Sequence, residues 1–194
     1  TKEKPEGICG SGLIDAISEL MKAGVLTKDG YLLTKDEALA SNVNINLCRC
    51  LQNNDEKMGN YFILSETNKV VVTQKDIRNV QLAKGAIQAG VEILLEKAKI
   101  SMDDIQRIKI AGVFGKFIHA SSAMAFGLLP NYPDKIEFIG NAAGNGVAKA
   151  LFDEKFASDI ESKVCEVRHI ELADEKDFQN KFLNAMELKE WYYN

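Results

Sequence analysis

Three glycine-rich stretches are the residues of this sequence best suited to chemistry. They read "GICGSG" at 7–12, "AGVFG" at 111–115 and "GNAAGNG" at 140–146, and each stands before a helical pattern or at the end of a strand pattern. Backbone N–H groups at helix starts are unpaired and bind anions, and glycine lets a flat ring approach the backbone closely. Three such turns converging on one cleft would suit a nucleotide.

Taken one at a time, the turns have a purely structural alternative. Glycines at strand–helix junctions also serve a positive φ or tight packing. "GICGSG" is not a phosphate-binding P-loop, because no Gly-Lys-Ser/Thr ends it, and "GVFGKF" lacks the required spacing. No strand precedes "GICGSG", so it does not match a dinucleotide fingerprint either.

The elements around these turns alternate between strands and helices. An apolar helix follows the first turn and ends at Gly24, and Thr73 with Asp76 caps a long helix from 74 to about 98. Residues 25–60 are polar and broken, which indicates short strands or irregular structure, and "YFILS" with "KVVVT" indicates a hairpin. Further strands are predicted at "RIKIAGVFG", "KIEFIG" and "EVRHIEL", and further helices at "SSAMAFGLLP", "NGVAKALFDEKF", "ASDIESKV" and, capped by Asp174, "DEKDFQNKFLNAMEL". The alternation favours an α/β architecture with a partly parallel sheet.

Composition and charge exclude several classes of function. The chain has 194 residues, of which 46% are hydrophobic and 27% charged, and a formal net charge of −4. It has no long basic stripe, so a nucleic-acid partner is not expected. No run approaches the roughly 20 apolar residues that span a bilayer, and no signal peptide opens the chain, so we expect a cytoplasmic protein without a membrane partner.

The remaining reactive side chains give weaker signals. Cys9, Cys48, Cys50 and Cys165 lack paired C-x-x-C spacing, which favours reduced thiols and predicts no metal site, with a metal-binding or redox Cys48–Cys50 pair as the alternative. His119 and His169 are isolated.

Several larger side chains could contact a ligand or a partner. Arg78 and Lys84 are expected on a solvated helix face, whereas Lys116, directly after the second turn, is a better candidate for the cleft. Trp191, Tyr192 and Tyr193 would anchor the C-terminal residues either to the body of the protein or to a partner subunit.

Longer stretches carry a family resemblance. "GICGSGLID", "TQKDIRNVQLAKGAIQAGVEILL", "DDIQRIKIAGVFGKFI", "AFGLLP" and "IEFIGNAAGNGVAKALF" closely resemble the C-terminal domain of the ATP-dependent reductive activators of corrinoid proteins. These iron–sulfur proteins re-reduce cobalt in corrinoid methyltransferase systems. The resemblance runs from Gly7 to about Leu188 and covers only the later part of the family's architecture.

The resemblance implies a fold. The family belongs to the superfamily of acetate and sugar kinases, heat-shock chaperones and actin, in which two ribonuclease-H-like lobes close on ATP. We therefore expect residues 1–194 to form a single C-terminal lobe of an actin-like ATPase domain. The lobe would be a mixed sheet flanked by helices, with an irregular insertion around 25–72, and a fragment of a larger protein.

The resemblance also implies an ATP site. The second turn would line the base and ribose, the first would form the opposite wall, with Asp15 accepting from a ribose hydroxyl, and the third would begin the hinge helix between the lobes. The residues implied are Gly10, Ser11, Gly12, Asp15, Ala111, Gly112, Val113, Phe114, Gly115, Gly140 and Asn141, and Lys116 follows the second turn as a further candidate. Val113 stands where relatives commonly carry a second glycine of this turn.

The same resemblance implies what the full-length protein does. It would couple ATP hydrolysis to the one-electron reduction of Co(II) to Co(I) in a corrinoid protein partner, and it is compatible with a homodimer. No D-x-G-T phosphate turn and no cysteine set for an iron–sulfur cluster occur in this sequence. Ligands for Mg²⁺ and for the cluster are therefore expected upstream, and the fragment alone should not hydrolyse ATP.

Two alternatives remain open at this stage. The lobe would suit a related kinase or a 2-hydroxyacyl-CoA dehydratase activator, which share the superfamily fold. It would also suit a non-catalytic dimerisation or docking module that keeps the fold without the nucleotide.

Overall fold

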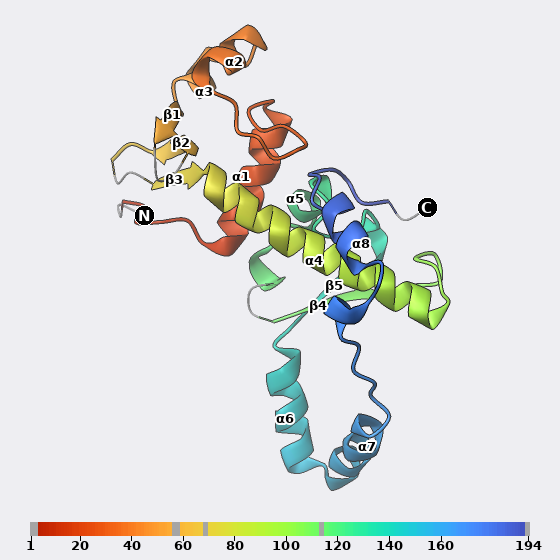
Figure 1. Ribbon diagram of the computed structural model, residues 1–194. Helices are drawn as coiled ribbons and strands as arrows, with labels where there is room; N and C mark the ends of the chain where they lie inside the picture. The colour runs from red at the N-terminus through yellow and green to blue at the C-terminus, as the bar shows by residue number, and fades with distance from the viewer. Residues whose placement is uncertain (1–3, 56–58, 68–69, 113–114, 193–194) are drawn as a thin grey trace.

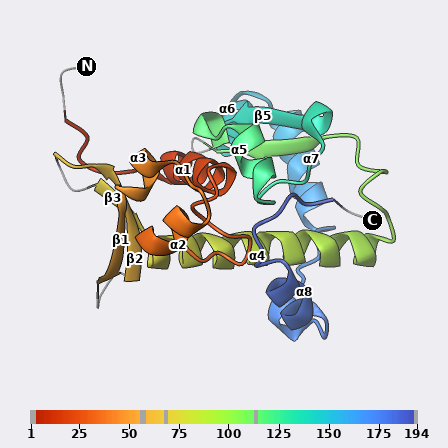
Figure 2. The same cartoon turned by 90° about the horizontal axis from the view of Figure 1, so that it is seen from above.

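One long helix, α4 (Gln74–Ala98), runs through the middle of the molecule and contacts both halves of the chain (Figure 1). The computed structural model describes residues 4–55, 59–67, 70–112 and 115–192. Figure 2 shows α8 on one side of α4, and α1, α5 and β5 on the other. The fold is mixed α/β as the sequence predicted, although the described strands form two separate sheets rather than one mixed sheet.

The first half of the chain builds a small helical and antiparallel unit. Its helices and strands are α1 (Gly10–Lys22), α2 (Lys35–Ala40), α3 (Ile45–Cys48), β1 (Leu51–Asp55), β2 (Gly59–Ser65) and β3 (Val70–Thr73). The three strands form one antiparallel sheet in the order β1-β2-β3, which confirms the predicted hairpin. Residues 25–72 are therefore more regular than expected from the sequence.

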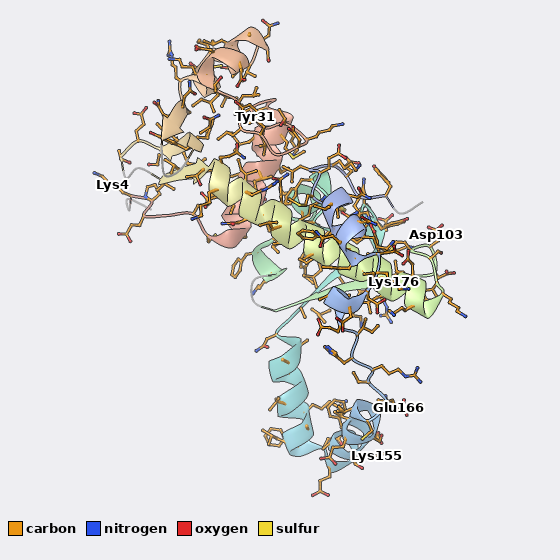
Figure 3. All side chains as sticks on the ribbon, viewed as in Figure 1. Lys4, Tyr31, Asp103, Lys155, Glu166 and Lys176 are labelled. Atoms are coloured by element: carbon orange, nitrogen blue, oxygen red, sulfur yellow. The ribbon has the colours of Figure 1, made fainter. Side chains whose placement is uncertain are left out.

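The second half contains a parallel strand pair and an extended helical hairpin. Its elements are β4 (Ile108–Ala111), η1 (Gly115–Phe117), α5 (Ala120–Ala125), η2 (Pro133–Lys135), β5 (Ile136–Gly140), α6 (Ala142–Phe152), α7 (Glu154–Val164), η3 (Leu172–Asp174) and α8 (Phe178–Asn184). β4 and β5 pair in parallel. The α6–α7 hairpin extends away from α4, with Lys155 in α7 and Glu166 just after α7 (Figure 3).

The main core lies between α1, α5 and the small sheet. Fully buried apolar side chains of α1, β3, α4 and α5 meet there, and they include Ile17, Val72, Ile77 and Ala123. A second cluster joins Leu95, Met102 and Trp191, so Trp191 anchors the C-terminal residues to the body of the protein. No helix in the described ranges is long and apolar enough to cross a membrane.

The start of α4 follows directly from local sequence. The Thr73 hydroxyl accepts from the Asp76 N–H at 3.1 Å, and the Asp76 carboxylate accepts from the Thr73 N–H at 3.0 Å. This reciprocal capping box satisfies two donors that the first turn would otherwise leave unpaired. It confirms the predicted helix start.

Lys84 corrects a sequence prediction, because it is buried rather than on a solvated face. Its side chain is only 1% exposed, and its ammonium donates to the carbonyls of Ala185 and Glu187 at 2.5 Å each. One turn earlier, the buried Gln81 amide donates to the carbonyls of Asp29 and Met186 at 3.0 Å each. These bonds hold residues 185–191, which we call the C-terminal strap, against α4.

Burial of Lys84 gives folding stability a distinct pH dependence. Loss of water lowers the pKa of Lys84 from 10.5 to about 8, and Lys189 adds to the lowering while Glu187 and Glu92 oppose it. Between these values the unfolded chain binds more protons at this position than the folded one, so stability rises with pH. We expect the wild type to gain on the order of 2 kcal/mol between pH 7.5 and 9.5 relative to Lys84→Met, measured by urea unfolding. Parallel pH profiles for the two proteins would contradict this assignment.

Three further predictions about the second half were wrong. "EVRHIEL" forms no strand: residues 167–171 are irregular and η3 follows. Asp174 does not cap the last helix, which starts at Phe178 after Asp177. The helix predicted over "NGVAKALFDEKF" ends at Phe152, because the Asp153 carboxylate accepts from the Phe156 N–H at 2.9 Å and caps α7 instead.

Candidate functional site

The carboxyl ends of β4 and β5 bring two of the predicted turns together. Ala111 pairs with Gly140 after a register shift, and the Gly112 N–H donates to the Gly140 carbonyl at 2.7 Å. In a parallel sheet this edge is where loops and helix starts gather and where ligands bind. The second and third glycine turns therefore form one surface.

The backbone conformation at positions 112 and 140 requires glycine, and there is open space beside both residues. Their φ angles are +96° and +64°, in the region where side chains other than glycine are strained. A Cβ added at either position would meet no atom of the described residues within 4 Å. Gly115 differs, since a Cβ there would lie 2.8 Å from the Ile110 side chain, so it serves packing.

Asn141 caps the helix that leaves this edge. Its side-chain oxygen accepts from the Gly144 N–H at 3.0 Å, and the first turn of α6 carries no acidic side chain. The start of α6 therefore keeps the partial positive charge of a helix N-terminus beside Gly140.

The first predicted turn forms the start of α1. Gly10, Ser11 and Gly12 are the first three residues of the helix, and the preceding Cys9 provides no side-chain cap. The Cys9 thiol lies 3.2 Å from the Ser11 hydroxyl, which with the Gly12 N–H lowers the pKa of Cys9. This helix start also lacks acidic side chains.

An apolar cavity connects the start of α1 with the end of β4. Its volume is about 380 Å³. It is lined by Gly10, Leu13 and Ile14 of α1, Val80, Ala83 and Ile87 of α4, Ile110 of β4, and Ile118, Leu128 and Leu129. A cavity of this size and polarity suits a flat apolar ring, with polar groups placed at its rim.

Asp15 contacts His119, the residue before α5, and the sequence did not reveal this contact. Its Oδ2 lies 2.9 Å from His119 Nδ1, while its Oδ1 is buried and has no hydrogen bond to any described residue. The pKa of Asp15 is lowered, first by the Ser122 hydroxyl and then by His119, although Ser122 does not reach hydrogen-bonding geometry with Oδ1. Asp15 thus fixes the residue before α5, and the exposed His119 ring stands next to it.

The other predicted residues add little polar chemistry. Lys116 is exposed in η1, between β4 and α5, and Val113 and Phe114 fall outside the described residues. Cys9, Cys48, Cys50 and Cys165 are free thiols. Within the described ranges no three His, Cys, Asp or Glu side chains gather to hold a metal ion.

The structure brings the second and third turns to one sheet edge, where Gly112 bonds to Gly140 and Asn141 follows. The first turn lies at the apolar cavity, which Gly10 and Ile110 both line. His119 and Ser122 are the residues that sequence reasoning missed. Their link to Asp15 spans more than 100 positions, so no local pattern could have indicated it.

Comparisons with known proteins place this arrangement in a family. The family described as the C-terminal domain of RACo, the ASKHA domain, matches residues 1–193. Corrinoid activation enzyme RamQ of Eubacterium limosum is 36% identical over 193 residues, which are 95% of this chain and 32% of that protein. The Co(II) methylated amine-specific corrinoid protein reductase of Methanosarcina barkeri is 27% identical over 188 residues, which are 95% of this chain and 29% of that protein.

A solved structure supports the same relationship. The reductive activator for corrinoid, iron–sulfur protein superposes with a TM-score of 0.78 at 31% identity, covering 94% of this chain and 28% of its own. The present chain spans about a third of the length of these relatives. The fold is accordingly the actin-like lobe expected from the sequence, and the chain belongs to the family of C-terminal ASKHA domains of RACo.

Proposed function

We propose that residues 1–194 supply the ATP-binding wall of an ATP-dependent reductive activator of corrinoid proteins. The observation that carries the proposal is the meeting of Gly112 and Gly140 at one sheet edge, with open space beside both and an apolar cavity lined by Ile110 of the same strand, β4. The relatives' names, a corrinoid activation enzyme and a corrinoid protein reductase, support the corrinoid partner. The substrate would be the Co(II) corrinoid, which would be reduced to Co(I) by one electron from an iron–sulfur cluster in another part of the full-length activator.

The described residues fit the adenosine part of ATP. Ala111, Gly112 and Gly140 would present backbone to the base and ribose, and the helix starts at Gly10 and Asn141 would direct N–H groups toward polar ligand atoms. Asp15 would act through His119 rather than directly, since its Oδ2 faces that ring and its Oδ1 is buried. Bound ATP would supply the free energy of phosphate hydrolysis to the coupled reduction.

The described residues do not fit Mg²⁺ or an iron–sulfur cluster. They include no cluster of three candidate metal ligands, and each described cysteine is a free thiol. We therefore assign both groups to other parts of the activator and derive no step through them. In the proposed coupling, ATP binding favours one of two conformations that differ in affinity for the corrinoid protein.

Gly112→Asp tests the nucleotide assignment. A side chain at φ +96° is strained, and its carboxylate would project into the space proposed for the base and ribose and add a negative charge to the site of an anionic ligand. We expect at least a tenfold loss of affinity for a fluorescent ATP analogue, or about 1.4 kcal/mol, in a titration of the protein expressed from the complete gene.

Gly24→Asp is the matched control for that titration. Gly24 lies outside the three turns, has a positive φ of +71° as well, and a Cβ there would meet only the Val43 side chain among the described residues, at 3.8 Å. Its variant should bind the analogue like the wild type, with both variants checked for folding by circular dichroism. Equal affinities for Gly112→Asp and the wild type would refute the site. The formation of Co(I) in a corrinoid protein is measured by absorbance. If the protein binds the nucleotide but ATP does not stimulate this reduction, the corrinoid activity is refuted.

We infer that the protein works in the cytoplasm. The described cysteines are free thiols, the usual state of cysteine in that reducing compartment. A homodimer remains a prediction, and sedimentation velocity would test it.

A further inference from the structure

Asp15 and His119 join the first glycine turn to the segment that leaves the second. Asp15 lies on α1, one helical turn after Ser11, and its Oδ2 lies 2.9 Å from His119 Nδ1. His119 follows η1, the short turn that begins at Gly115, by two residues. Because helical side chains tilt toward the helix N-terminus, the Asp15 carboxylate holds the His119 ring beside the start of α1.

This contact determines which ring nitrogen of His119 carries the proton. An ionised carboxylate can only accept a hydrogen bond, and the Ser122 hydroxyl is the main cause of the lowered pKa that keeps Asp15 ionised. His119 Nδ1 is therefore the donor, and Nε2 of the neutral ring is left as an acceptor. The His119 side chain is 74% exposed, and its Nε2 makes no hydrogen bond to the residues that the structure describes.

Asp15 itself has no oxygen free for a ligand. Its Oδ2 is occupied by His119, and its Oδ1 is buried without a hydrogen bond to any described residue. Ser122, one turn after His119, is buried too, and α1 contacts α5 at this place. Asp15 can therefore influence a ligand only by orienting the His119 ring, which makes it a positioning residue.

The surface around the first turn offers hydrogen-bond donors but few acceptor side chains. The first turns of α1 and α6 carry no acidic residue, and their unpaired backbone N–H groups donate. The apolar cavity is lined by glycine and aliphatic residues, among them Ile14 and Ile118, the chain neighbours of Asp15 and His119. A ribose hydroxyl needs an acceptor, and His119 Nε2 supplies one beside these donors.

We propose that His119 accepts a hydrogen bond from a ribose hydroxyl of the bound nucleotide and that Asp15 orients it for this contact. The pair would make the site prefer ribonucleotides, because a site that bonds a hydroxyl disfavours the analogue that lacks it. The inference rests on the proposed nucleotide site and adds its sugar specificity. Since His119 is largely exposed, we expect the modest preference of a single hydrogen bond, about fivefold.

Competition against a fluorescent ATP analogue tests the inference in the protein expressed from the complete gene. The wild type should bind ATP about fivefold more tightly than one of the two monodeoxy forms, 2′-deoxy-ATP and 3′-deoxy-ATP. His119→Phe should bind all three nucleotides with equal affinity. His169→Phe is the matched control, since His169 is 84% exposed and likewise lies beside a carboxylate, that of Glu171, and it should keep the wild-type preference.

Asp15→Ala separates the positioning role from direct contact. This variant keeps the imidazole but releases it, so the preference should fall to that of His119→Phe, and the double variant should show no further loss. A preference that survives in either single variant would overturn the inference.

The same titrations separate this inference from the proposed function. Wild-type protein that binds ATP and both monodeoxy forms equally would overturn the role of His119 and leave the nucleotide site in place. Wild-type protein that binds none of them would refute the site and this inference with it. If Asp15→Ala fails to fold, the comparison of His119→Phe with His169→Phe, both at exposed positions, still decides.

Discussion

Lys84→Ala is expected to destabilise the protein by about 3 kcal/mol, although the change is far from the candidate nucleotide surface. The variant removes two charge-assisted bonds and strands the carbonyls of Ala185 and Glu187. It also leaves a cavity where a fully buried side chain stood. The variant no longer has to bury the Lys84 charge, but this gain offsets only part of the lost stability. Urea unfolding followed by circular dichroism measures the change.

Lys75→Ala is the matched control on the same helix. Lys75 is exposed on the first turn of α4, so its removal should change stability by no more than about 0.5 kcal/mol. A loss below about 1 kcal/mol for Lys84→Ala would show that its two bonds contribute little beyond the desolvation they require.

Gly127→Ala should also destabilise the protein, by about 3 kcal/mol, because Gly127 lies against Lys189 of the C-terminal strap. Gly127 has φ +80°, which strains any side chain. A methyl group there would overlap the carbonyl oxygen of Lys189 and come within 3.1 Å of Lys84 Cε. Because backbone on both sides is held by hydrogen bonds, the strap would have to shift. Thermal and urea unfolding measure the change.

Gly146→Ala provides the comparison for Gly127→Ala. Gly146 is a helical glycine with open space around its added Cβ. Alanine favours the helix over glycine by roughly 0.5–1 kcal/mol, so this variant should be as stable as the wild type or more stable. Equal stability of Gly127→Ala and the wild type would mean that the strap adjusts without strain.

Local signals explain what the sequence predicted correctly. Thr73 and Asp76 contact each other within one turn, so their spacing alone indicates the start of α4. The glycine turns at 111–115 and 140–146 follow short apolar strands, and parallel pairing of those strands brings Gly112 to Gly140. An equivalent signal at Thr34 and Glu37 forms a complete capping box for α2, although the surrounding polar residues suggested irregular structure.

Long-range partners explain what the sequence could not predict. Lys84 resembles a surface lysine of an amphipathic helix, and only the strap, about 100 residues later in the chain, supplies its acceptors. His119 is likewise unremarkable until folding places it against Asp15. "EVRHIEL" has a strand-like composition, but no described strand pairs with it and the segment stays irregular.

The C-terminal strap also bears on how this domain is made. The Leu188 N–H donates to the Lys28 carbonyl at 2.7 Å. The side chains of Gln81 and Lys84 find their acceptors only in the carbonyls of Met186 and Glu187. During synthesis the early residues emerge long before these partners exist, so the core around α4 stays incomplete until residue 188 has left the ribosome. Contacts of such high sequence separation slow folding, and the nascent chain exposes apolar surface in the meantime. We therefore expect the domain to fold as one unit, and only after its last helix has been translated.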